Sequence, residues 1–348
     1  MASEAAQAQA RLTAERRESR LGIIERLLLA VDGLPGPAWL AYVALGLVLA
    51  VVGHVIVVLV GVNQQLGLYH DVAMPALIFA WFAWLTHALN VVARRTFDEF
   101  KPALGQPEME AGYRRALTTI DDRWAVVAAV GANVVVSIAY YVGVRPFREA
   151  VNPGVELVST PLWGLTAATL GVVVLHTINQ LRLVSRLSAV ARNVDIFKPQ
   201  PINSFARLTA VGALGLIAFV VAFVLYSPAQ PLPYVIQEAV VLAIAAASFV
   251  LPLRVMHSRL AAEKARLESA SQERLKQMLE RIHEAVDAND LSRAEQLRQA
   301  LNALLAERDV LARLHTWPWS TSTFRGFASA LLLPILLILF TQLIDRFL

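Results

Sequence analysis

The chain contains seven stretches of about 20 predominantly apolar residues, and polar segments separate them. An apolar helix of about 20 residues is long enough to cross the hydrocarbon core of a bilayer. The pattern therefore predicts an all-α polytopic membrane protein with seven transmembrane helices. The predicted spans are residues 38–62, 73–93, 124–144, 161–181, 208–226, 232–253 and 324–344.

Residues 254–316, between the sixth and seventh spans, are polar, have helical periodicity and contain no Pro or Gly. The apolar residues among them recur every three or four positions in two runs, which residues 288–290 separate. Ser292 followed by Glu295 has the spacing of a capping box, which predicts that a second helix begins there. We therefore expect an antiparallel helical hairpin that projects about 40–50 Å from the membrane. Its apolar positions are Leu260, Leu267, Leu275, Met278, Ile282, Val286, Leu297, Leu301, Leu304, Leu305, Leu311 and Leu314.

Composition and charge agree with a membrane protein and predict its orientation. Hydrophobic residues make up 57% of the chain and charged residues 17%, and the mean hydropathy is +0.54. In soluble chains, hydrophobic residues average about 45–50% and charged residues about 25%. Of the 31 Lys and Arg residues, 27 lie in the N-terminal segment and in the loops that share its side of the membrane. The positive-inside rule therefore predicts a cytoplasmic N-terminus and an extracellular C-terminus.

These boundaries divide the chain into four predicted regions. Residues 1–37 form a cytoplasmic region with an amphipathic helix, and residues 38–253 form a six-helix transmembrane domain. Residues 254–316 form the cytoplasmic hairpin, and residues 317–348 form the seventh span with its extracellular C-terminus. The N-terminal helix either lies on the inner leaflet or packs against the protein's own cytoplasmic part. Its apolar positions are Leu12, Leu21, Ile24, Leu27 and Leu28.

Two groups of polar residues lie within the spans, where ionisable side chains mark functional sites by default. In the outer group, Glu238 is either an ion-coordinating or proton-accepting carboxylate in a vestibule, or a structural carboxylate paired with Arg145. The inner group lies on the second and fourth spans at one depth, and interhelical hydrogen bonding explains it better than a haem or metal site. The outer group is Glu238, Gln237, His54, Tyr140 and Tyr141, and the inner group is His87, Asn90, His176, Asn179 and Gln180.

The seventh span begins behind Trp317 and Trp319, which are typical of the headgroup level. Pro334 interrupts the span and allows a kink or a gate. Its outer end carries Thr341, Gln342 and Asp345, which are the polar residues that a water-filled lining requires.

Several kinds of chemistry have no candidate residues in this chain. Cysteine is absent, and no phosphate-binding Gly-rich loop, His-Glu-x-x-His motif or Gly-x-Ser-x-Gly motif occurs. We therefore expect neither an enzyme nor a bound metal or cofactor, and we expect no nucleic-acid partner.

The plan of the chain resembles that of the insect odorant and gustatory receptors. The shared features are seven spans, an internal N-terminus, cytoplasmic helices between the sixth and seventh spans and a C-terminus close behind the seventh. Of the family's last-span motif, Thr-Tyr, five hydrophobic residues and Gln-Phe, only the apolar run before Gln342 and Gln342 itself match. The resemblance implies a homotetrameric, ligand-gated cation channel whose last span lines the pore. Separately, residues 176–207 and 317–334 are similar to those of uncharacterised bacterial membrane proteins, which predicts a bacterial inner (plasma) membrane.

Three functions are compatible with the sequence, and an oligomeric ion channel is the leading hypothesis. In it, the seventh span lines the pore, Thr341 and Gln342 form a constriction and Asp345 forms an outer acidic ring. The hairpin joins the subunits, the lipid bilayer is the environment, and a small molecule is a possible ligand. The alternatives are a non-conducting scaffold or sensor that signals through the hairpin, and a proton-coupled transporter that uses Glu238.

Overall fold

The computed structural model describes residues 22–60, 70–105, 107–145, 152–190, 196–197, 200–226, 232–319 and 321–347. These residues form helices and turns and contain no strand. Seven of the described helices are long and apolar enough to cross a membrane. The predicted all-α fold with seven spans is therefore confirmed, and it is the architecture of an integral membrane protein.

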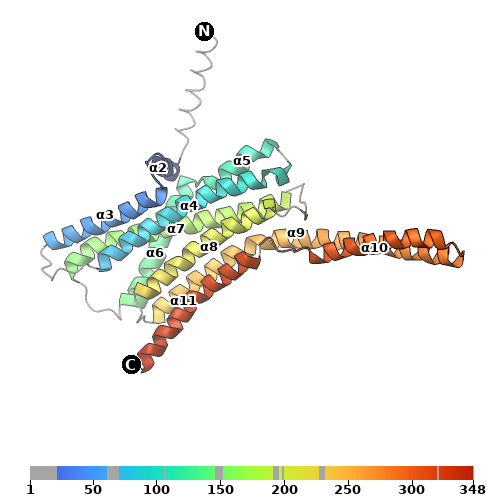
Figure 1. Ribbon diagram of the computed structural model, residues 1–348. Coiled ribbons are helices and arrows are strands. Elements are labelled where there is room, and N and C mark those ends of the chain that lie inside the picture. Colours follow the sequence, from blue (N-terminus) through green and yellow to red (C-terminus); the bar gives the residue numbers. More distant parts are fainter. Residues whose placement is uncertain are drawn as a thin grey trace, which may run out of the picture.

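The spans and the connecting helices are shown in Figure 1. The spans lie in α3 (Ala38–Leu59), α4 (His70–Leu104), α6 (Asp122–Ala139) with the π-helix η1 (Tyr140–Val144), α7 (Pro153–Val190), α8 (Gln200–Tyr226), the first part of α9 (Leu232–Asp287) and α11 (Thr321–Phe347). The other helices are α2 (Ile23–Asp32), α5 (Pro107–Thr118) and α10 (Leu291–Arg313).

Helices α4 and α8 form the centre of the bundle. Helix α4 packs against α3, α7 and α8, whereas α8 packs against α4, α9 and α11. More than half of the most apolar window of each is buried, at 56% and 61%, compared with 6% for the third span and 11% for α11. Helices α6 and α11 are therefore peripheral, and the core between the central helices contains the fully buried Phe82, Phe97, Phe100, Phe205 and Phe249.

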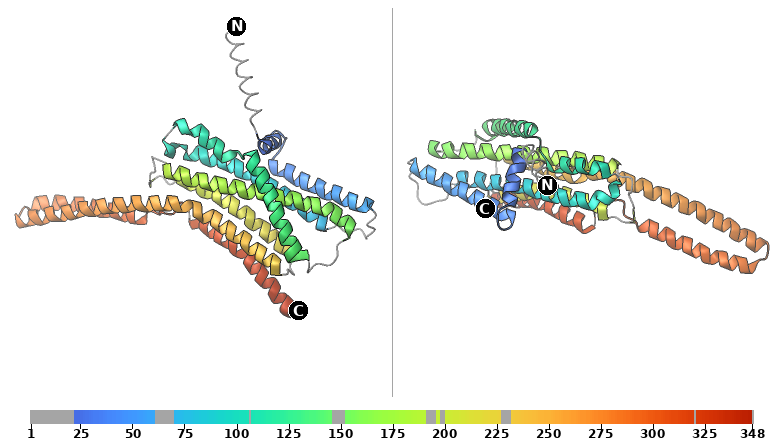
Figure 2. Two further views of the ribbon diagram at one scale, coloured as in Figure 1. Left: turned by 180° about the vertical axis from the view of Figure 1, so that it is seen from behind. Right: turned by 90° about the horizontal axis from the view of Figure 1, so that it is seen from above.

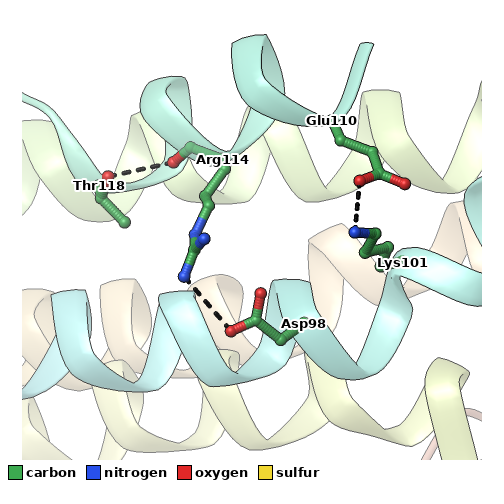
Figure 3. A network of polar contacts seen from close by, with 5 residues as sticks. All are labelled: Asp98, Lys101, Glu110, Arg114 and Thr118. Atoms are coloured by element: carbon green, nitrogen blue, oxygen red, sulfur yellow. Dashed lines mark hydrogen bonds and ion pairs between the residues drawn. The ribbon is translucent and has the colours of Figure 1, made fainter. Parts of the chain in front are cut away.

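Several helices continue beyond the apolar stretch that predicted them. Helix α4, for example, extends past residue 93 to Leu104. Its extension is polar, and four of its charged side chains have partners of opposite charge on neighbouring helices. Asp98 binds Arg114 of α5 at 3.5 Å, and Lys101 binds Glu110 at 2.6 Å (Figure 3). Hydropathy marks only the apolar part of a helix, so it underestimates the length of helices that continue as polar segments.

The predicted hairpin is confirmed, because α9 runs without a break from the sixth span and α10 returns along it (Figures 1 and 2). Asn289 has a φ of 58°, and the N–H groups of Asn289 and Asp290 donate to the carbonyls of Val286 and Ala285. This Schellman motif ends α9. The second helix begins at Leu291. The predicted capping box would make Ser292 the N-cap and residue 293 the first helical residue, so the predicted start is two residues late. The Ser292 hydroxyl instead donates to Asp290 Oδ1 at 3.3 Å.

Helix α2 crosses the direction of the spans beside the first turns of α3 and α6 (Figure 2). At its start, the Ile23 N–H donates to both carboxylate oxygens of Asp122, at 2.9 and 3.2 Å. At its end, Asp32 lies 3.2 Å from His87 Nε2. Leu28 is buried and Leu27 is exposed, so the helix packs on the bundle and leaves apolar surface free. The positions predicted for this helix at Leu12 and Leu21 lie outside the described residues.

The close approach of α6 and α7 depends on Gly171. A Cβ at this position would overlap the carbonyl oxygen of Ala128 and lie 2.7 Å from the Cβ of Ala132. We expect Gly171→Ala to lower the free energy of unfolding by about 1–3 kcal/mol, because the two backbones must separate. Unfolding in mixed micelles at increasing SDS fraction measures this change.

Gly131→Ala is the matched control, since it makes the same change in α6 where a Cβ meets nothing within 4 Å. There only the gain in helix propensity remains, about 1 kcal/mol. Equal effects of the two substitutions would contradict a backbone contact at Gly171.

Candidate functional site

The seventh span lies on the outside of the bundle, with one stripe of side chains facing α8. Phe327 and Pro334 are buried and Thr341 is half-buried, and these residues recur every seven positions along α11. The Thr341 hydroxyl donates to the carbonyl of Ile338 in its own helix at 2.9 Å. Among the predicted pore-lining residues, the structure therefore places Pro334 and Thr341 toward the bundle and Gln342 on the exposed side. The Asp345 side chain lies outside the described part of the chain.

A stack of aromatic rings joins the hairpin to the first turns of the seventh span. His257 of α9 stacks on Trp317, with ring centroids 4.0 Å apart and planes 7° apart, and Trp317 stacks on Trp319 at 4.3 Å. Trp319 stacks on Phe249 of α9 at 5.2 Å, and Phe249 stacks on Phe327 of α11 at 4.0 Å. We call these five residues the junction stack. It fixes the position of α11 relative to α9 where the hairpin meets the bundle.

Polar contacts reinforce the junction stack from the hairpin side. The Lys264 ammonium donates to the carbonyls of Ala312 and Leu314, at 2.9 and 3.0 Å, at the end of α10. Cations stabilise this end of a helix because its last carbonyls lack partners. His257 Nδ1 lies 3.2 Å from the Thr316 carbonyl. The end of α10, the connecting segment and α9 therefore form one connected unit.

The inner polar group is divided between two neighbouring clusters. In the first, His176 Nε2 of α7 lies 2.8 Å from Asn90 Oδ1 of α4 and 2.8 Å from Gln180 Nε2. Gln180 also donates to the carbonyl of Leu117 in α5 at 3.1 Å. All three side chains are buried, so this cluster connects α4, α5 and α7 by hydrogen bonds. Asn179 is half-buried on α7.

His87 belongs to the second cluster, at the end of α2. Its Nδ1 lies 3.4 Å from the Tyr42 hydroxyl, and its Nε2 lies 3.2 Å from Asp32. Arg94 is 3.9 Å from the same carboxylate. Neither Asp32 nor Tyr42 was among the predicted residues. The segment after Asp32, residues 33–37, carries no charge, so no local pattern in the sequence indicates the partners of this carboxylate on α4.

The outer polar group comes from three elements. Glu238 is buried on α9, and Tyr140 and Tyr141 lie in η1, which contacts α9. The two tyrosine rings are 5.4 Å apart, and the Arg145 guanidinium lies 5.2 Å from the Tyr141 ring centroid. His54 is half-buried on α3, which packs mainly against α4 and α7. Gln237 is exposed.

Two structural features bear on function. The last span, α11, is largely exposed, and the junction stack links it to the long hairpin. The sequence indicates Trp317 and Trp319, but it does not indicate their partners His257, Phe249 and Phe327. Comparison with family models, curated proteins and solved structures finds no match to this chain.

Proposed function

We propose that the chain is one subunit of a homotetrameric cation channel in the inner membrane of a bacterium. The N-terminus lies in the cytoplasm and the C-terminus outside. The α11 helices of the four subunits surround the pore, and the hairpins hold the subunits together. The tetramer, the cation preference and the possible small-molecule ligand come from the resemblance to insect odorant and gustatory receptors.

The observation that carries the proposal is the position of α11. It packs mainly on α8, and the rest of its surface is exposed, including Gln342 near its outer end. A polar amide on an apolar span is better satisfied across a water-filled pore or by another copy than by lipid. A peripheral helix that is anchored at its inner end is suited to facing a shared axis.

The hairpin supports the same assembly. Leu279 and Val286 are 41% and 52% exposed on α9, away from the face that packs on α10. They are seven residues apart, which puts them on one face of the helix and matches a coiled-coil spacing. A second hairpin would cover them.

We assign roles to the predicted pore residues from the exposed and buried faces of α11. The exposed side of α11, with Gln342 as its polar group, faces the axis. Pro334 faces α8, and it acts by freeing the carbonyl of Ala330 and permitting a kink. The sequence position of Asp345, one turn beyond Gln342, gives the outer acidic ring that concentrates cations.

Asp345→Lys is expected to reduce the ratio of cation to anion permeability several-fold. Purified protein in planar bilayers, under an ion gradient, should show a reversal potential that moves toward the anion equilibrium potential. Glu156→Lys is the control, because it makes the same charge change at the exposed start of α7. An unchanged reversal potential for Asp345→Lys would remove this residue from the pore mouth. Native mass spectrometry from nanodiscs tests the assembly, and a monomer would end the shared-pore proposal.

A further inference from the structure

Three cations at the basic end of the bundle have carboxylate partners on α4 and α5. Lys101 binds Glu110 at 2.6 Å, Arg114 binds Asp98 at 3.5 Å and Arg207 binds Glu99 at 2.7 Å (Figure 3 shows the first two pairs). These carboxylates neutralise the three cations.

Helix α7 presents two further cations. Arg182 and Arg186 are exposed and one turn apart, so they lie on the same face of the helix. No carboxylate in the described part of the chain forms an ion pair with either guanidinium.

The packing of α7 identifies the face on which the two arginines lie. Gly171 contacts Ala128 of α6, and Arg182 follows Gly171 by about three helical turns, which returns it to the same face. Helix α6 begins at Asp122, only about six residues before the contact at Ala128. Its first turn therefore does not extend to the level of Arg182. Helix α5 contacts α7 through Gln180, which lies about half a turn away on the opposite face.

Among the described residues, no helix covers the strip of α7 beyond the first turn of α6, and this strip has an apolar border. Trp124, in the first turn of α6, is 61% exposed, and Ile178 of α7 is 40% exposed. An exposed Trp at the end of a span is typical of the headgroup level. Apolar side chains toward the membrane centre and unpaired arginines beyond them form a surface suited to an amphiphile with a negative head.

The two carboxylates next to Trp124 in the sequence accept hydrogen bonds from backbone N–H groups. Asp121 accepts from the Arg123 N–H at 2.9 Å and caps α6. Asp122 accepts from the Ile23 N–H at the start of α2. Exposed Arg123 adds a further cation at this end of α6.

We infer that Arg182, Arg186 and Trp124 form a binding site for an anionic phospholipid in the leaflet at the basic end of the bundle. The two guanidinium groups bind the phosphate, and its acyl chains lie along the α6–α7 surface beside Trp124 and Ile178. Basic surfaces between spans on this side of a membrane are known to hold acidic headgroups. The site does not depend on the proposal of a channel.

The test compares two double variants that remove the same charge from the same end of the full-length protein. Native mass spectrometry in detergent, with phosphatidylglycerol titrated in, measures the lipid retained. Arg182→Gln with Arg186→Gln should weaken binding about thirtyfold, which corresponds to about 1 kcal/mol for each arginine. Arg114→Gln with Arg207→Gln should retain binding close to the wild-type level, because those arginines are already paired within the protein.

Three outcomes would overturn the inference. Equal loss in both double variants would indicate general attraction to a basic surface rather than a site. Equal retention of phosphatidylcholine and phosphatidylglycerol by the wild type would remove the requirement for an anionic headgroup. Complete displacement of phosphatidylglycerol by millimolar inorganic phosphate would identify a site for soluble anions. Since all four arginines are exposed, thermal unfolding of each variant should match the wild type.

Discussion

Replacing Leu279 and Val286 with aspartate is expected to dissociate the protein into monomers. Both side chains are exposed in a single chain and lie on one face of α9, outside the α9–α10 contact. In the proposed tetramer, each is buried against a neighbouring hairpin, which contributes about 1.5–3 kcal/mol per side chain. Two aspartates remove this contribution and add buried charge, so the dissociation constant should rise at least a hundredfold. Native mass spectrometry and single-molecule photobleaching in nanodiscs count the subunits.

The matched control is Ala270→Asp with Gln277→Asp. These residues are also exposed and seven apart on α9, but on the opposite flank of the helix. They add the same charge and impose a similar cost in helix propensity. The control should leave the subunit count unchanged. If the Leu279 and Val286 variant stays assembled, the hairpin does not hold the subunits together.

The number of spans could be predicted because lipid imposes a simple rule on the sequence. Any segment that crosses the bilayer must be apolar for about 20 residues, and seven such segments occur. The ends of the helices could not be predicted in this way. In α4, for instance, Asp98 and Lys101 of the polar extension contact charged partners on α5, and hydropathy carries no information about those partners.

The sequence also could not predict which face of α11 contacts the bundle. This helix is apolar on all sides, so periodicity gives no direction. Pro334 and Thr341 were therefore grouped with Gln342, although seven-residue spacing from Phe327 puts them on the packed stripe. Contacts between polar residues at equal depth on helices of the same direction were easier to predict than the packed face of α11. Asn90 and His176 could be expected to meet, and they lie 2.8 Å apart.

The junction stack was missed for a related reason. Trp317 and Trp319 are conspicuous beside a proline, and they were assigned to the headgroup level as single anchors. Their partners His257 and Phe249 lie on α9, about 60 residues earlier in the chain, and no local pattern connects the two segments. Only the return of α10 along α9 brings them together.

Phe327→Ala is expected to lower the free energy of unfolding by about 3–5 kcal/mol. The ring is 5% exposed and stacks on the fully buried Phe249 at 4.0 Å, so its removal leaves a cavity between α9 and α11. Loss of this contact frees the first turns of α11 from the hairpin. Chemical unfolding in micelles, followed by tryptophan fluorescence, measures the change, because Trp317 and Trp319 lie in the same stack.

Phe324→Ala is the control for this prediction, since it removes the same ring three residues earlier in α11. Phe324 is 45% exposed, and its ring lies 5.7 Å from Trp319, so its loss leaves no enclosed cavity and should cost less than about 1 kcal/mol. In the proposed channel, Phe327→Ala should also abolish gating by uncoupling the hairpin from the pore helix, whereas Phe324→Ala should conduct normally. Similar losses of stability in the two variants would mean that the junction stack does not fix α11 to α9.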